Sequence, residues 1–268
     1  MKFLLSALIV AALAGPALAA EVPVDLELVL AIDVSGSIDE EEAQLQREGY
    51  MAALVDRDVL AAIKGGINGR IALAYFEWSN ADMQRTVVDW RVIDGEASAK
   101  AFVAELAANP PMRGRFTSIS GAIDYAVPMF ANNGFEGTRR AIDISGDGPN
   151  NRGRRITDAR EDALAKGITI NGLPIVNDRP NFFGRPMPNL DRYYRECVIG
   201  GPGALYVIAK DFQAFANAIR RKLILEISDL GMPADQPRPL LRLAADERDA
   251  PNCDAGENEF RGRFYRQP

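Results

Sequence analysis

The chain has 268 residues, of which 47% are hydrophobic, and its 37 acidic residues outnumber its 31 basic ones, giving a formal net charge of −6 at pH 7. This acidic balance disfavours nucleic acid and other polyanions as partners. The chain contains no histidine, which excludes Ser-His-Asp and Cys-His catalysis and removes the commonest zinc ligand.

Residues 1–20 are typical of a secretory signal peptide. Lys2 precedes an apolar stretch at 3–13, and Ala17-Leu18-Ala19 supplies the small residues that a signal peptidase needs. The sequence therefore predicts cleavage near Ala19 or Ala20 and a periplasmic or secreted protein. We expect no membrane span, because the leader is short and no later apolar segment is long and unbroken enough.

Strand and helix patterns alternate along residues 24–228. The apolar segment 26–33 predicts a buried strand, and Ser37 with Glu40 matches an S-x-x-E capping box that predicts a helix from Ser37 to about Val55. We expect further strands at 70–78, 86–92, 139–145, 168–176 and 204–208, and helices at 96–108, 118–130, 154–166, 190–198 and 211–227. Asp211 is the expected N-cap of the last helix, and Pro128 should end or kink the helix that contains it.

This alternation predicts an α/β fold with a doubly wound, mostly parallel six-stranded sheet and helices on both faces. The short gap between 70–78 and 86–92 predicts one antiparallel edge strand. We assign residues 24–228 to a single domain. Residues 229–268, which are rich in proline and charge, are assigned to a C-terminal tail or short extension.

Three loops carry hard oxygen donors. Asp33, Ser35 and Ser37 follow the first strand at alternating positions, Thr117 precedes a helix, and Asp147 lies between two glycines after strand 139–145. Ligands of open doubly wound sheets bind at the carboxyl ends of the strands, where the winding reverses, so these side chains are expected to converge. Carboxylates and hydroxyls suit Mg²⁺, Mn²⁺ or Ca²⁺. The structural alternative is that each residue caps a helix or shapes a turn.

Other charged residues have simpler interpretations. Asp143 lies in the middle of a predicted strand, where a buried carboxylate needs a hydrogen bond or an ion pair, and we favour that role over metal ligation. The basic runs 152–155 and 220–222 fall in predicted helices and are interpreted as solvated faces rather than a nucleic-acid surface.

The order Asp33-x-Ser35-x-Ser37, then Thr117, then Asp147 resembles the metal-ion-dependent adhesion site (MIDAS) of von Willebrand factor type A (VWA) domains, which have a Rossmann-like fold. The resemblance covers residues 24–228. The segments 143–151, 193–195 and 198–203 also resemble an uncharacterised bacterial family of exported VWA-like proteins. One position departs from the wider VWA pattern, because Gly146 stands where a threonine usually precedes the aspartate, and Ser145 could substitute for the lost hydroxyl.

The resemblance implies a metal-dependent binding module rather than an enzyme. Ser35 and Ser37 would bind the cation through their hydroxyls, and Thr117 would do so directly or through water. Asp33 and Asp147 would hold coordinated waters or ligate in their stead. Mg²⁺ is the first expectation, with Mn²⁺ or Ca²⁺ as alternatives, and a partner protein would donate an Asp or Glu carboxylate to complete the coordination shell.

Two other functions stay open on the sequence. A metal-assisted hydrolase is one alternative, although no general base stands out in a chain without histidine. A solute-binding protein is another, although such proteins usually have two lobes and this chain is long enough for one.

The chain has two cysteines, Cys197 and Cys253. In an oxidising compartment they could pair. Such a disulfide would stabilise the fold by about 4 kcal/mol in the chain-entropy model. It would also link the tail covalently to the domain. Two unpaired thiols are the alternative.

Overall fold

The computed structural model describes residues 20–176, 186–210, 214–228 and 251–258. A five-stranded sheet lies at its centre, in the order β4-β3-β2-β6-β7. The strands are β2 (Glu27–Asp33), β3 (Ile71–Trp78), β4 (Gln84–Ile93), β6 (Arg140–Gly146) and β7 (Thr169–Pro174). All neighbours are parallel except β3 and β4, which form an antiparallel pair at the edge. The predicted α/β class, the mostly parallel sheet and the antiparallel edge strand are thus confirmed.

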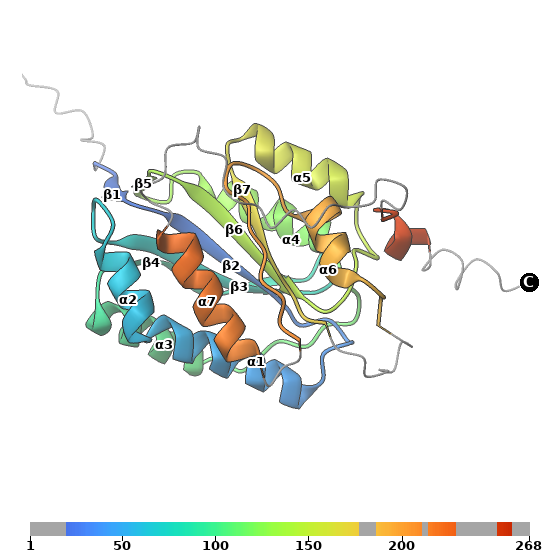
Figure 1. Ribbon diagram of the computed structural model, residues 1–268, viewed down its shortest axis with the longest axis horizontal. Helices are drawn as coiled ribbons and strands as arrows, with labels where there is room; N and C mark the ends of the chain where they lie inside the picture. Colours follow the sequence, from blue (N-terminus) through green and yellow to red (C-terminus); the bar gives the residue numbers. More distant parts are fainter. Residues whose placement is uncertain (1–19, 177–185, 211–213, 229–250, 259–268) are drawn as a thin grey trace, which may run out of the picture.

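Helices cover both faces of the sheet (Figure 1). One layer contains α1 (Glu40–Leu54), α2 (Arg57–Lys64), α3 (Glu96–Ala107) and α7 (Phe215–Ser228); the other contains α4 (Ile119–Ala126), α5 (Ile156–Ala165) and α6 (Leu190–Tyr193) with the π turn Tyr194–Val198. Along β2, Leu28 and Leu30 pack with the first layer, while Val29 and Ala31 pack with the second. Because successive strand residues face opposite sides, burial of both faces requires the continuous apolar run seen in the sequence.

The sixth predicted strand, at 204–208, forms isolated bridges beside β7 rather than a continuous ladder. The Gly172 N–H donates to the Leu205 carbonyl at 3.0 Å, and the Val207 N–H donates to the Gly172 carbonyl at 3.1 Å. Pro174 follows in β7, and its ring nitrogen has no hydrogen to donate to this segment. The ladder is therefore interrupted at Pro174. A second, two-stranded sheet of β1 (Val22–Val24) and β5 (Phe135–Gly137) has no counterpart among the predicted elements.

The first helix begins later than predicted. The N-cap of α1 is Asp39, whose Oδ1 accepts the Glu42 N–H at 2.8 Å, while Glu42 Oε2 accepts the Asp39 N–H at 3.0 Å. This D-x-x-E box replaces the expected S-x-x-E box, so Ser37 does not cap the helix. The Ser37 hydroxyl can therefore contact other side chains near the end of β2.

Other helix boundaries follow local signals. Ser118 caps α4, which ends at Ala126 and passes into the 3₁₀ turn Val127–Phe130 at Pro128, as expected. The short helix α2, capped by Asp56, has no counterpart among the predicted elements. Asp211, the expected N-cap of the last helix, lies outside the described residues. The same holds for residues 1–19 of the predicted leader at 1–20, and for residues 229–250 and 259–268 of the tail.

Lys222 corrects the expectation that the basic run 220–222 forms a solvated face. This side chain of α7 is fully buried, with its Nζ 2.6 Å from Asp143 Oδ2 and 3.1 Å from Glu226 Oε2. The same contacts confirm that Asp143 of β6 forms an ion pair. A buried carboxylate without such a partner would be strongly destabilising.

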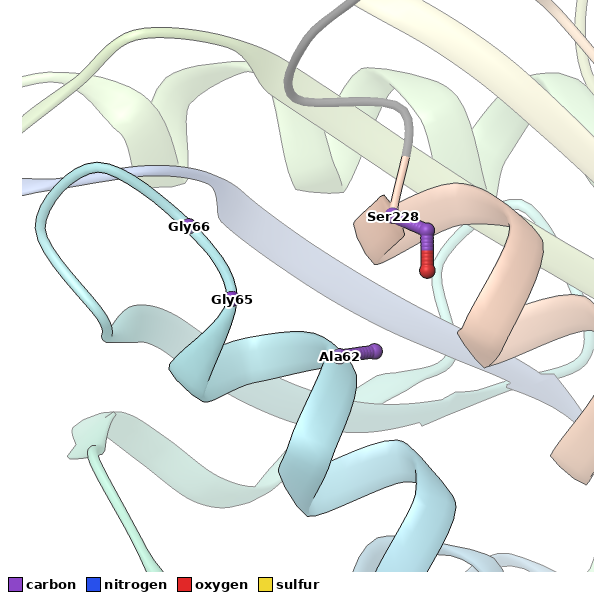
Figure 2. A pocket seen from close by; sticks show the side chains of 4 residues that line it. All are labelled: Ala62, Gly65, Gly66 and Ser228. Atoms are coloured by element: carbon purple, nitrogen blue, oxygen red, sulfur yellow. The ribbon is translucent and has the colours of Figure 1, made fainter.

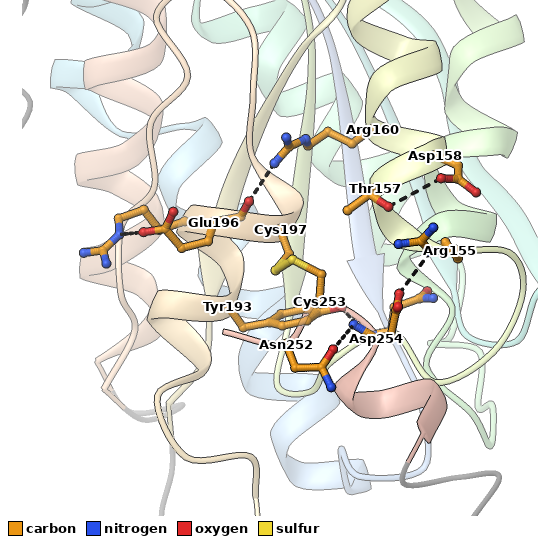
Figure 3. The surroundings of a disulfide bond; sticks show 12 residues. Arg155, Thr157, Asp158, Arg160, Tyr193, Glu196, Cys197, Asn252, Cys253 and Asp254 are labelled. Atoms are coloured by element: carbon orange, nitrogen blue, oxygen red, sulfur yellow. Dashed lines mark hydrogen bonds and ion pairs between the residues drawn. A yellow bond between two sulfur atoms is a disulfide. The ribbon is translucent and has the colours of Figure 1, made fainter. Parts of the chain in front are cut away.

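Of the two alternatives for the cysteines, the structure has the disulfide. Cys197 and Cys253 are bonded, with 5.5 Å between their Cα atoms, and Figure 3 shows the C-terminal segment that contains Cys253 beside the segment that contains Cys197. In the described part of the chain, no helix has the length and apolar character needed to cross a bilayer.

Candidate metal centre

The candidate site lies where β2 and β6 end. Asp33 is the last residue of β2, and Asp147 directly follows β6. The two strands are parallel neighbours, with Ile32 opposite Ser145, and β3 lies on the other side of β2. The chain thus leaves β2 at the point where the order of strands reverses, which is the usual ligand-binding position of an open α/β sheet.

Four of the five predicted site residues form a continuous chain of short contacts. The Ser35 N–H donates to Asp33 Oδ1 at 2.7 Å, and the hydroxyls of Ser35 and Ser37 are 3.1 Å apart. The Ser37 hydroxyl donates to Asp147 Oδ1 at 2.6 Å. Oxygens that are distant in sequence therefore meet at one end of the sheet.

Thr117 lies against the loop that carries Asp147. Its N–H donates to Asn151 Oδ1 at 3.0 Å, and the Asn151 N–H donates to the Thr117 carbonyl at 2.8 Å. A Cβ added to Gly148 would lie 3.7 Å from Thr117 Oγ1 and 3.9 Å from Thr117 Cγ2, so the Thr117 side chain packs beside the residue after Asp147. Because Ser118 caps α4, Thr117 is not needed as a cap.

Burial dominates the electrostatics of the two carboxylates. Burial and the neighbouring charge of Asp147 raise the pKa of Asp33 well above its ordinary value. Burial raises the pKa of Asp147 to about 6, although the hydrogen bond from Ser37 acts in the opposite direction. Asp33 Oδ2 is buried and has no hydrogen-bond partner among the described residues. One carboxylate thus has an oxygen without a hydrogen bond, and a second carboxylate lies nearby. A divalent cation bound here would compensate the buried negative charge of both groups.

The donor set suits a hard cation. The predicted set consists of two carboxylates and three hydroxyls. The described residues contain no cluster of three or more Asp, Glu, Cys or His side chains placed to hold a metal ion. Oxygen-only sets of this kind fit Mg²⁺, Mn²⁺ or Ca²⁺.

Tyr194 is a neighbour of the site that sequence reasoning missed. A Cβ added to Gly146 would lie 2.8 Å from the Tyr194 hydroxyl and 2.9 Å from Asp33 Oδ2, so both oxygens pack against the same face of this glycine. Burial and the charge of Asp33 raise the pKa of Tyr194 well above its ordinary value, which keeps the phenol protonated and able to donate. The Ser145 hydroxyl instead lies 3.5 Å from Gln46 Oε1 of α1. Neither the Tyr194 hydroxyl nor Asp33 Oδ2 has a hydrogen-bond partner among the described residues, so the two oxygens are neighbours of Gly146 that do not bond to each other.

A pocket of about 250 Å³ lies elsewhere, between the C-terminal ends of α2 and α7 (Figure 2). Ala62, Gly65, Gly66 and Ser228 line it, and none of them has an acidic or basic side chain. The loop that lines it leads into the start of β3, so the pocket is at the opposite end of the sheet from Asp33. It is not a candidate active site.

One protein family matches most of the chain. Its model, described as "Protein of unknown function (DUF1194)", matches residues 23–231. No curated protein matches the chain.

Solved structures with the same fold include three of distant sequence. Proximal thread matrix protein 1 from the mussel byssus, in a form described with a zinc-occupied MIDAS motif, is 16% identical with a TM-score of 0.57 over 77% of this chain and 49% of that one. The pilus adhesin SpaC from Lactobacillus rhamnosus GG is 14% identical with a TM-score of 0.55 over 77% of this chain and 30% of that one. A von Willebrand factor type A protein from Catenulispora acidiphila is 12% identical with a TM-score of 0.53 over 76% of this chain and 43% of that one.

The chain spans about half the length of the mussel protein and less of the other two. Likeness at these identities shows the fold alone, whereas the family model spans the whole sheet and its helices. The chain therefore belongs to the DUF1194 family, and its fold is that of a VWA domain.

Proposed function

We propose that this protein is an exported binding module that uses a divalent cation at a MIDAS-like site to capture a carboxylate of a partner protein. The observation that carries the proposal is the buried, unpartnered Asp33 Oδ2. The other oxygen of this carboxylate accepts the Ser35 N–H, and the Ser35 hydroxyl is linked through the Ser37 hydroxyl to Asp147. Since burial disfavours the charged form of both aspartates, a bound cation would supply the missing compensation.

Each predicted ligand has a role in this proposal. Ser35 and Ser37 would contact the cation through their hydroxyls, Thr117 would do so directly or through water, and Asp33 and Asp147 would hold coordinated waters or ligate. Neutral hydroxyls leave most of the positive charge uncancelled, so the bound cation would act as a Lewis acid toward an incoming carboxylate. Mg²⁺ is the first choice, with Mn²⁺ or Ca²⁺ as alternatives.

Two observations favour an exported binding protein over an enzyme. Proteins with this fold include a pilus adhesin and a byssal matrix protein, and the chain has no histidine to act as a general base beside the site.

The Cys197–Cys253 disulfide fits an oxidising compartment outside the cytoplasm and agrees with the predicted leader at 1–20. The proposed module spans residues 24–228.

Isothermal titration with Mg²⁺, Mn²⁺ and Ca²⁺ tests the metal site. We expect the wild-type protein to bind one ion, and Asp33→Asn, which keeps the side-chain shape, to weaken that binding by about tenfold or more. Asp89→Asn is the matched control, because Asp89 is exposed on the edge strand β4. Equal affinity in the wild type and Asp33→Asn, or no binding in the wild type, would overturn the proposed site.

Capture from an envelope fraction tests the use of the ion. A partner should be retained by immobilised wild-type protein in Mg²⁺ and released by a chelator, and Asp33→Asn should retain none. Retention that is the same with and without the chelator would contradict metal-dependent capture. Metal-dependent hydrolysis that is lost in Asp33→Asn would instead favour the hydrolase.

A further inference from the structure

The C-terminal segment 251–258 lies against the loop that follows Asp147, although the two are far apart in sequence (Figure 3). The Cys253–Cys197 disulfide ties this segment to the π turn Tyr194–Val198. The carboxylate of Asp254 pairs with Arg155 at 3.2 Å, just before α5. The segment is thus fixed on two sides.

Directly after these two anchors, the segment covers Asn150. Glu257 Oε1 accepts a hydrogen bond from Asn150 Nδ2 at 2.7 Å. Gly256 comes so close that an added Cβ would lie 2.2 Å from the Asn150 carbonyl oxygen. A side chain at this position would therefore have to displace either the segment or the loop beneath it.

Asn150 in turn holds the loop of the candidate metal centre. It is fully buried, and its N–H donates to the Tyr193 hydroxyl at 3.1 Å. Its Oδ1 accepts the Ser120 N–H of α4 at 2.9 Å, and its Nδ2 also donates to the Arg154 carbonyl at 3.1 Å. The loop that begins at Asp147 is thereby tied to α4 and α6 by one side chain and its backbone.

The next residue extends this connection to the other side of the site. Asn151 exchanges two hydrogen bonds with the backbone of Thr117, at 3.0 and 2.8 Å. A shift of the 147–151 loop would therefore move Asp147 and Thr117 together. Because metal affinity depends on ligand placement to within a fraction of an ångström, this loop must be held firmly.

We propose that the disulfide-anchored segment 251–258 is a positioning element of the candidate metal centre, in which Glu257 acts through Asn150 to place Asp147 and Thr117. This inference rests on the proposed function, because it assigns the segment a role toward the same cation. The disulfide keeps Glu257 close to Asn150. Without this link, the effective concentration of Glu257 near Asn150 would be much lower. Loss of Glu257 would remove one acceptor from a buried amide and loosen the loop.

Metal affinity of Glu257 variants tests the inference. We expect Glu257→Ala to weaken Mn²⁺ binding by about tenfold. This is the lower end of the range of losses seen when a residue that supports a metal ligand is removed. Glu257→Gln should retain near wild-type affinity, since its amide oxygen can accept the same hydrogen bond. Glu161→Ala is the matched control, because Glu161 is exposed on α5. Wild-type affinity in Glu257→Ala, or equal losses in Glu257→Ala and Glu257→Gln, would overturn it.

A second measurement does not require metal. Hydrogen exchange of the metal-free protein should be faster across 146–155 in Glu257→Ala and in the Cys197→Ser/Cys253→Ser double variant, with β3 unchanged. Unchanged exchange in 146–155 would overturn the positioning role while leaving the proposed function intact. Failure of the wild-type protein to bind any of the three cations would overturn the proposed function itself, and the positioning role with it.

Discussion

At the scale of single residues, the candidate site is defined by two neighbouring buried carboxylates, Asp33 and Asp147. Asp33 is fully buried and has one oxygen without a hydrogen bond, and burial raises the pKa of Asp147 to about 6. In the absence of a cation, protons are the available means of neutralising these groups. Protons and metal ions should therefore compete.

This competition predicts a pH-dependent response to metal. The pKa of Asp147 in the folded protein, about 6, exceeds its ordinary value of 3.8. Proton binding by Asp147 thus stabilises the metal-free fold fully below 3.8, and this contribution is lost as the pH rises through about 6. Metal binding should offset that loss, so the increase in Tm caused by MgCl₂ should be larger at pH 7.5 than at pH 5.

Thermal unfolding with and without MgCl₂ at the two pH values measures this effect. Asp89→Asn should respond as the wild type does, and Asp147→Asn should show a much smaller increase at pH 7.5. An increase that is equal or larger at pH 5 would contradict the competition between protons and metal.

Part of this site could be predicted from the sequence. Asp33 and Asp147 could be placed because each directly follows an apolar strand, and Ser35 is brought in by the same turn. The capping role of Ser37 was predicted incorrectly because two overlapping capping patterns are present, and the one with Asp39 and Glu42 forms. Tyr194 could not be placed, since its approach to Asp33 across Gly146 depends on how α6 packs on the sheet.

At the scale of elements, α7 is held on the sheet by a buried network of charges. Lys222 lies between Asp143 of β6 and Glu226 of its own helix, and Asn171 of β7 donates to Glu226. The basic run 220–222 was misleading because its members face different ways. Arg220 pairs with Asp56 at the start of α2, whereas Lys222 points into the core.

Removal of this buried cation should be costly. Lys222→Ala would leave Asp143 and Glu226 buried without their shared partner, and we expect a loss of about 3–5 kcal/mol in the free energy of unfolding. Arg221→Ala, an exposed neighbour on the same helix, should change it by less than about 0.5 kcal/mol. Urea denaturation of both variants tests this, and similar values for the two would show that the network does not stabilise α7.

Elements with strong local patterns could be predicted, and those that depend on pairing could not. The buried strands are continuous apolar runs. The helix α4 ends at Ala126, just before the 3₁₀ turn that contains Pro128, whose ring nitrogen has no hydrogen to continue the helix. The segment 204–208 has strand-like composition, yet its ladder with β7 is interrupted by Pro174, a residue of the other strand. The short strands β1 and β5 depend on each other and carry little signal alone.

At the scale of the whole molecule, the fold brings together loops that are distant in sequence. The order β3-β2-β6 places the ends of β2 and β6 side by side, and α4 brings Thr117 to the same place. Alternation of strands and helices predicts this class of sheet, and the position of the three loops at strand ends predicts that they converge. The family resemblance added the role of each residue toward a cation. The docking of 251–258 beside Asn150 could not be predicted, because two cysteines fix a bond but not the contacts around it.

An anomalous difference map from crystals grown with Mn²⁺ tests most directly whether these oxygens share one ion. A shared metal site predicts a single strong peak within coordination distance of the Ser35 and Ser37 hydroxyls, beside Asp33, Thr117 and Asp147, with a remaining position open to water or a carboxylate. A peak elsewhere, or none at this site in Mn²⁺-saturated crystals, would contradict it.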